Sequence, residues 1–145
     1  MYLTPDPVYT DDTLTAWATI VDEDGDALEV TYRFFVGVDM VQEGPSNTLD
    51  GTIHFDKDQT VYVAVMAFDG LVSHTEISST ITVQNSVPVF SSVTLASLAP
   101  YTNDTVTATV DASDADDDAL TTTYRFIVDG DVAQEGTSNT LDGTV

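Results

Sequence analysis

The chain has no cysteine among its 145 residues, which excludes a disulfide framework and any metal site built on thiolates. Basic residues are almost as scarce, because three lysines and arginines stand against 25 acidic residues, for a net charge of −22. Nucleic acid and anionic membrane surfaces bind proteins through lysine and arginine, which replace counterions. We therefore expect cations as partners and no binding to nucleic acid.

Several other features are missing. No apolar run reaches the roughly 20 residues of a membrane-spanning helix, so we expect no membrane insertion. No nucleophile–base arrangement, phosphate-binding loop or HExxH zinc motif is found, and we expect no enzyme activity. Trp17 is the single tryptophan.

What the sequence does contain is a long internal repeat. Residues 9–53 return as residues 101–145 at a constant offset of 92, and 27 of the 45 aligned positions are identical. A period of this length is the size of one small β-domain and exceeds that of solenoid repeats. We therefore predict two domains: residues 1–87 form the first repeat, and residues 88–145 form the first part of a second.

Both copies have the pattern of β-strands. Thr, Val, Ile, Tyr and Phe crowd runs of alternating polarity, and almost nothing has a helical period. Short strands separated by turn residues predict an all-β fold of tandem antiparallel immunoglobulin-like β-sandwiches. The strands expected in the first copy are residues 2–4, 13–20, 28–36, 40–42, 48–53, 60–68 and 76–83.

The second copy contains the early strands but no counterpart of the closing pair, 60–68 and 76–83. We therefore expect the second unit to be incomplete. Either the 145 residues are a segment of a longer polypeptide whose next residues resemble His54–Pro88, or the unit docks on something different. Of these alternatives we favour the segment, because large apolar residues on the third strand would otherwise face water.

An acidic loop recurs in both copies, with aspartates held at alternate positions while the residues between them change. Oxygen ligands at i, i+2 and i+4 on a loop that can curl suit Ca²⁺, which takes six to eight oxygens. The alternative is a solvated acidic turn on an acidic protein. Asp69 lies in the turn expected beside the first loop, and it either completes that site or forms a simple Asp-Gly turn. The six loop aspartates are Asp22, Asp24 and Asp26 in the first copy and Asp114, Asp116 and Asp118 in the second.

The two arginines, Arg33 and Arg125, occupy equivalent positions of the repeat. We expect each to form an outward cross-strand ion pair, with Glu43 and Glu135 respectively. Asn103 begins an N-glycosylation sequon, which matters only in an extracellular setting.

Three segments, DEDGDALEVTYRFFV, TVYVAVMAFDG and the linker NSVPVF, carry a resemblance to a known group of proteins. The sequence resembles the tandem immunoglobulin-like repeats of prokaryotic surface proteins, of the polycystic-kidney-disease and cadherin-like types. The resemblance implies an extracellular or cell-surface location and a role as a spacer, an adhesin or a calcium-stiffened rod.

Our first hypothesis is a structural extracellular repeat protein whose domains follow head to tail and are stiffened by calcium in a fibre, stalk or adhesin. Its partners are calcium and further copies of the repeat, through homo-assembly or continuation of the array. A second hypothesis is a carbohydrate- or ligand-binding accessory module of a secreted enzyme. Trp17 becomes Thr109 in the second copy, which counts against a repeated binding face. A third is that the acidity keeps a halophile's protein soluble.

Overall fold

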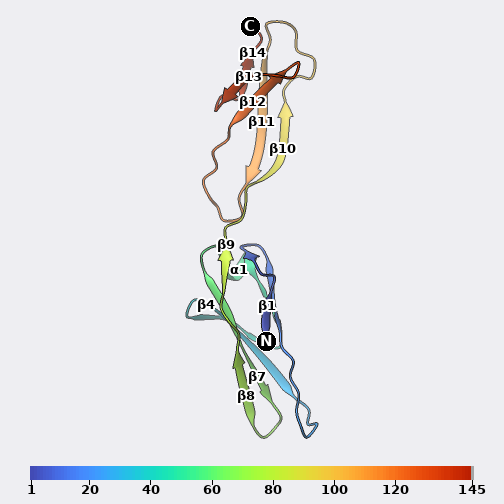
Figure 1. Cartoon of the computed structure of the whole chain (residues 1–145), viewed down its shortest axis with the longest axis vertical. Helices are drawn as coiled ribbons and strands as arrows, with labels where there is room; N and C mark the ends of the chain where they lie inside the picture. Colours follow the sequence, from blue (N-terminus) through green and yellow to red (C-terminus); the bar gives the residue numbers. More distant parts are fainter. Residues whose placement is uncertain (145) are drawn as a thin grey trace. The chain divides into compact units, whose positions relative to one another are not determined.

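The computed structural model describes residues 1–144 and divides into two compact units, unit 1 (Met1–Ser86) and unit 2 (from Val87 on). The fold is all-β, as predicted (Figure 1). The described residues form fourteen strands and one helix of four residues. No helix within residues 1–144 has the length and apolar character that crossing a membrane requires.

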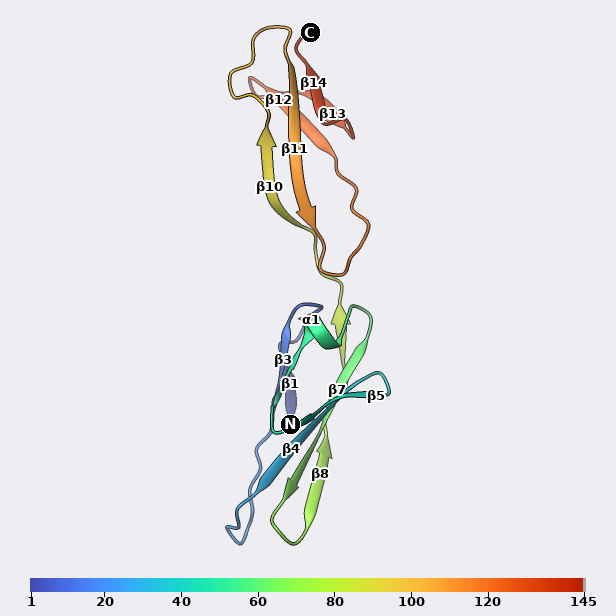
Figure 2. The same ribbon diagram turned by 180° about the vertical axis from the view of Figure 1, so that it is seen from behind.

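Unit 1 contains two sheets. The first has the strand order β1-β3-β6 and is antiparallel, with β1 at Tyr2–Thr4, β3 at Thr13–Trp17 and β6 at Thr48–Asp50. The second has the order β2-β9-β7-β4-β5, and β2 runs parallel to β9. β8 also pairs with β7, and Figure 2 shows these two strands beside β4 and β5. Its strands are β2 (Val8–Tyr9), β4 (Glu29–Val36), β5 (Asp39–Gly44), β7 (Thr60–Phe68), β8 (Ser73–Ile77) and β9 (Ile81–Gln84).

One hydrophobic core is shared by the two sheets of unit 1. Buried residues alternate with more exposed ones along β3, since successive side chains of a strand point to opposite faces. Two sheets around one core are consistent with a β-sandwich. The buried core residues are Leu3, Leu14, Ala16 and Leu49 from the first sheet, Val8, Phe34, Val61, Val63, Val65 and Val83 from the second, and Phe55.

Unit 2 also contains two groups of strands. β10 (Val89–Leu95), β11 (Thr105–Ser113) and β14 (Thr140–Asp142) form an antiparallel sheet, and β12 (Tyr124–Val128) pairs with β13 (Asp131–Gly136). The bounds of β13 and β14 are those of β5 and β6 moved by 92 residues. The register of β12 with β13 shifts after Phe126, and the register of β4 with β5 shifts at the equivalent place.

The repeated stretch SNTLDG has a structural role in both units. The Asn47 side chain donates from Nδ2 to the carbonyl of Ala16 at 3.0 Å, while the Ala16 amide donates to the carbonyl of Asn47 at 2.8 Å. Asn139 and Ala108 make the same pair of bonds in unit 2, at 3.1 and 2.8 Å. Each asparagine therefore fixes the chain where it enters the short edge strand.

The predicted cross-strand ion pairs are confirmed. Arg33 Nε lies 2.7 Å from Glu43 Oε1, and Arg125 Nη2 lies 3.0 Å from Glu135 Oε1. In unit 2 the hydrogen bond and the opposite charge raise the pKa of Arg125 and lower the pKa of Glu135. Both pairs lie on exposed faces, where solvent screens them, so they contribute little to stability.

Four predicted strands differ from the structure by more than one residue at an end. The strand expected at 13–20 ends at Trp17, and the strand expected at 40–42 covers Asp39–Gly44. The strand expected at 48–53 ends at Asp50, because the chain enters the short helix α1 (Gly51–His54). Asp50 is the N-cap of this helix, and its Oδ1 accepts a hydrogen bond from Thr52 N at 3.0 Å. The strand expected at 76–83 is two strands. β8 pairs with residues 64–68 of β7, whereas β9 pairs with Thr60 and Val61 at the other end.

Candidate metal centre

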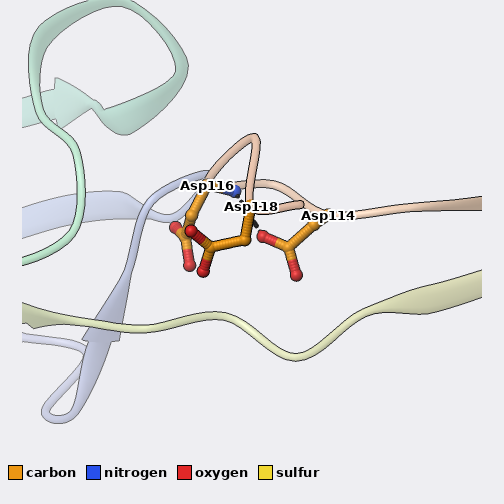
Figure 3. A group of neighbouring side chains, drawn as sticks. All are labelled: Asp114, Asp116 and Asp118. Carbon is orange, nitrogen blue, oxygen red and sulfur yellow. Dashed lines mark hydrogen bonds between the residues drawn. The ribbon is translucent and has the colours of Figure 1, made fainter. Parts of the chain in front are cut away.

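The acidic loop of unit 2 connects β11 to β12 and brings three carboxylates together (Figure 3). One carboxylate oxygen from each of Asp114, Asp116 and Asp118 lies within 4.8 Å of the other two. Asp116 is only 8% exposed, Asp114 is partly buried and Asp118 is exposed. Among His, Cys, Asp and Glu of the described chain, this is the one group of three that is gathered so closely.

A tight turn of the backbone produces this arrangement. Asp114 Oδ1 accepts a hydrogen bond from Asp116 N at 2.9 Å, and the Asp114 carbonyl accepts one from Asp117 N at 3.3 Å. Asp117 has a left-handed φ of 56°, a conformation that aspartate tolerates better than most residues. The turn therefore places the alternate aspartates around one point, with the intervening residues outside.

The chemistry of such a group favours a hard cation. Three negative charges this close repel one another, and a bound cation removes that repulsion. Carboxylate oxygens are the ligands that Ca²⁺ takes at about 2.3–2.6 Å, together with backbone carbonyls and water. The group supplies three of the six to eight oxygens that Ca²⁺ needs.

The acidic loop of unit 1 has a different local geometry. Asp22 Oδ1 accepts hydrogen bonds from both Asp24 N and Asp26 N, each at 3.0 Å. Within residues 1–144 these three aspartates do not form a group as close as the one in unit 2. That they bind a metal ion stays a prediction.

Asp69 caps the turn between β7 and β8. Its Oδ1 accepts hydrogen bonds from the amides of Leu71 and Val72, both at 2.7 Å. The bond from Val72, followed by the bond from Leu71, lowers the pKa of the Asp69 carboxyl below its usual value. These bonds describe the Asp-Gly turn, and the completion of a metal site by Asp69 stays a prediction.

An exposed aromatic pair lies outside the acidic loops. Tyr2 and Trp17 face each other in the register of β1 and β3, with ring centroids 6.5 Å apart and ring planes 18° from parallel. Their exposed fractions are 60% and 52%, and Trp17 Nε1 donates to Thr4 Oγ1 at 2.9 Å. The sequence draws attention to Trp17 alone, because the strand register that brings Tyr2 beside it depends on tertiary structure.

Comparison of the chain with models of protein families, with curated proteins and with solved structures finds no match. A proposal about function therefore rests on three features of the chain itself, which are the internal repeat, the gathered carboxylates and the exposed aromatic pair.

Proposed function

We propose that this protein is a structural repeat protein of the cell exterior. In this proposal, immunoglobulin-like units follow one another head to tail in a fibre, stalk or adhesin, and Ca²⁺ bound at the acidic loops stiffens them. The observation that carries the proposal is the group of Asp114, Asp116 and Asp118 on a unit whose sequence is repeated. The same aspartates recur in unit 1, which extends the proposal to Asp22, Asp24 and Asp26.

The charge of the chain supports a cation as the partner. With a net charge of −22, the compact state is opposed by repulsion among its own carboxylates. A divalent ion held by the folded loop relieves that repulsion, and it stabilises the folded state because the unfolded chain does not preserve the site. The stability of the folded units is thus expected to depend on the calcium concentration of their surroundings.

Calcium is expected to raise the melting temperature of the protein, and a chelator is expected to lower it. A ligand at 100 times its dissociation constant that binds only the folded state adds about 2.7 kcal/mol to the free energy of unfolding. For units of this size that corresponds to a shift of roughly 10–20 °C. The measurement is thermal unfolding followed by circular dichroism with Ca²⁺ or with EDTA, at constant ionic strength.

Two matched triple variants serve as controls. Replacing Asp114, Asp116 and Asp118 by asparagine is expected to abolish the calcium-dependent shift of unit 2, whereas the same change at Asp22, Asp24 and Asp26 tests unit 1 by itself. Sodium at equal ionic strength separates calcium binding from a general need for salt. Melting that does not respond to EDTA at fixed salt would contradict the proposal, and an equal response to sodium would favour the halophile explanation.

A second candidate function is the binding of carbohydrate, which the Tyr2 and Trp17 pair favours. Two exposed, nearly parallel rings offer a flat apolar surface of the kind on which a sugar ring stacks. Because Trp17 is the single tryptophan, its fluorescence reports directly on this surface. Sugars that bind in a glycan array are expected to change the fluorescence of Trp17 when they are added in solution. Trp17→Ala is expected to remove the binding. The control Phe90→Ala, which removes an exposed aromatic side chain of unit 2, is expected to preserve it. An array without any signal leaves the structural role as the proposal.

A further inference from the structure

The second strand group of unit 2 has an open edge. In unit 1, β4 is hydrogen-bonded on one side to β5 and on the other side to β7. Its counterpart in unit 2, β12, pairs with β13, and among residues 1–144 no strand pairs with its other side. Four of the five residues of β12 are identical to residues 32–36 of β4, so the two strands present nearly the same edge.

The lengths of the two strands show the effect of a missing neighbour. β4 begins at Glu29, but β5 pairs with it only from Tyr32 onward. The first three residues of β4 pair with Phe68, Ala67 and Met66 of β7. β12 begins at Tyr124, the equivalent of Tyr32, and residues 121–123 are not in a strand. Residues 29–31 of β4, which pair only with β7, thus correspond to residues 121–123, which are not in a strand in unit 2.

An apolar groove of about 320 Å³ lies beside this edge. It is lined by Phe90, Val93 and Leu95 of β10, by Ala108 and Val110 of β11 and by residues 122–127. Leu95 is 47% exposed, whereas its counterpart in unit 1, Leu3, is 8% exposed. In unit 1 the space next to β4 is filled by Val61, Val63 and Val65 of β7, which are all buried.

We propose that the edge of β12 and this groove bind an extended segment with the chemistry of Thr60–Phe68. Such a segment has valines at alternate positions and lies antiparallel to β12. The register of unit 1 predicts its position: the counterpart of Val65 lies opposite Tyr124, that of Val63 opposite Phe126, and that of Val61 opposite Val128. Main-chain hydrogen bonds to the edge supply affinity, and the alternate valines that enter the groove supply specificity.

A second folded copy of this chain does not fit as the occupant. Its own β7 is engaged in unit 1 by eight residue pairs with β4, and withdrawing it would open that core. Edge-to-edge pairing of two β12 strands also leaves both grooves unfilled, because Phe126 of each copy is already buried within its own unit. The occupant is therefore a strand of the same repeat type that has not been folded into a unit of its own.

The test uses the whole chain in EDTA, so that its result is independent of calcium and of the proposed structural role. A synthetic peptide that copies residues 54–84 is added in one arm, and in a second arm the same residues are appended to the chain. Amide hydrogen exchange of residues 121–128 is expected to slow by about tenfold or more. The amides of residues 29–36, whose edge is already paired, are expected to be unchanged.

The control peptide carries Val61→Asp, Val63→Asp and Val65→Asp. The proposal is supported if the copied peptide or the appended segment slows exchange of residues 121–128 and the control peptide does not. The arm that responds shows whether the strand binds as a separate chain or as a continuation of the same chain. Absence of protection in both arms overturns it, as does equal protection by the control peptide. Protection of residues 121–128 in the chain alone, together with a dimer in sedimentation, overturns it in favour of a second copy as the occupant.

Discussion

Replacing Phe34 by alanine is expected to lower the free energy of unfolding of unit 1 by about 3–5 kcal/mol, the range for deleting a large buried aromatic side chain. Phe34 is completely buried, and its strand β4 is flanked on both sides, by β5 and by β7. The cavity left by the ring cannot collapse easily between two hydrogen-bonded neighbours. Urea unfolding followed by the fluorescence of Trp17, which lies in unit 1, measures the loss.

The matched control is Phe126→Ala, the same substitution at the equivalent position of unit 2. Phe126 is 9% exposed, and its strand has a neighbour on one side. The change is expected to cost unit 2 less than Phe34→Ala costs unit 1, and to leave the Trp17 transition where it is in the unchanged protein. Equal shifts of the Trp17 transition in the two variants would contradict the view that each phenylalanine belongs to the core of its own unit.

The strands of unit 1 could be predicted from the sequence where the local pattern alone decides them. The bounds of β1 (Tyr2–Thr4) and β7 (Thr60–Phe68) are those expected from their apolar runs. β2 (Val8–Tyr9) was not expected, because Pro5 and Pro7 stand just before it. Its pairing partner is β9, about 75 residues away, and a local pattern carries no information about such a contact.

The sequence predicts which residues form the candidate site but not how they are arranged. The repeat identifies the aspartates, since the residues between them change while the aspartates remain. The repeat does not show that the carboxylates of Asp114, Asp116 and Asp118 lie close together in unit 2. It also does not show that in unit 1 a single oxygen of Asp22 accepts hydrogen bonds from two backbone amides. That difference depends on the conformation of each loop, and one intervening residue is glycine in the first loop and aspartate in the second.

Replacing Gly51 by alanine is expected to destabilise unit 1 by about 3 kcal/mol, the upper part of the range for forcing an extra carbon into a packed site. A Cβ at this position would meet the carbonyl oxygens of Thr10 and Asp12, the latter at 2.6 Å, and the ring of Phe55 at 2.7 Å. The Gly51 amide also donates to the Asp12 carbonyl at 2.9 Å, so the backbone cannot move away without breaking that bond. Thermal and urea unfolding followed by Trp17 fluorescence measure the loss.

The control for this substitution comes from the repeat itself. Gly37 has a φ of 61° with open space where a Cβ would lie, and its counterpart in unit 2 is Asp129, which has a φ of 54°. Gly37→Asp is therefore expected to change the free energy of unfolding by roughly 1 kcal/mol or less, since aspartate adopts this conformation more readily than most residues. Gly143 repeats the close approach in unit 2, where a Cβ would lie 2.6 Å from the carbonyl oxygen of Asp104. If Gly51→Ala were as mild as Gly37→Asp, the contact of α1 with the loop before β3 would not be the reason that both copies keep a glycine after Leu-Asp.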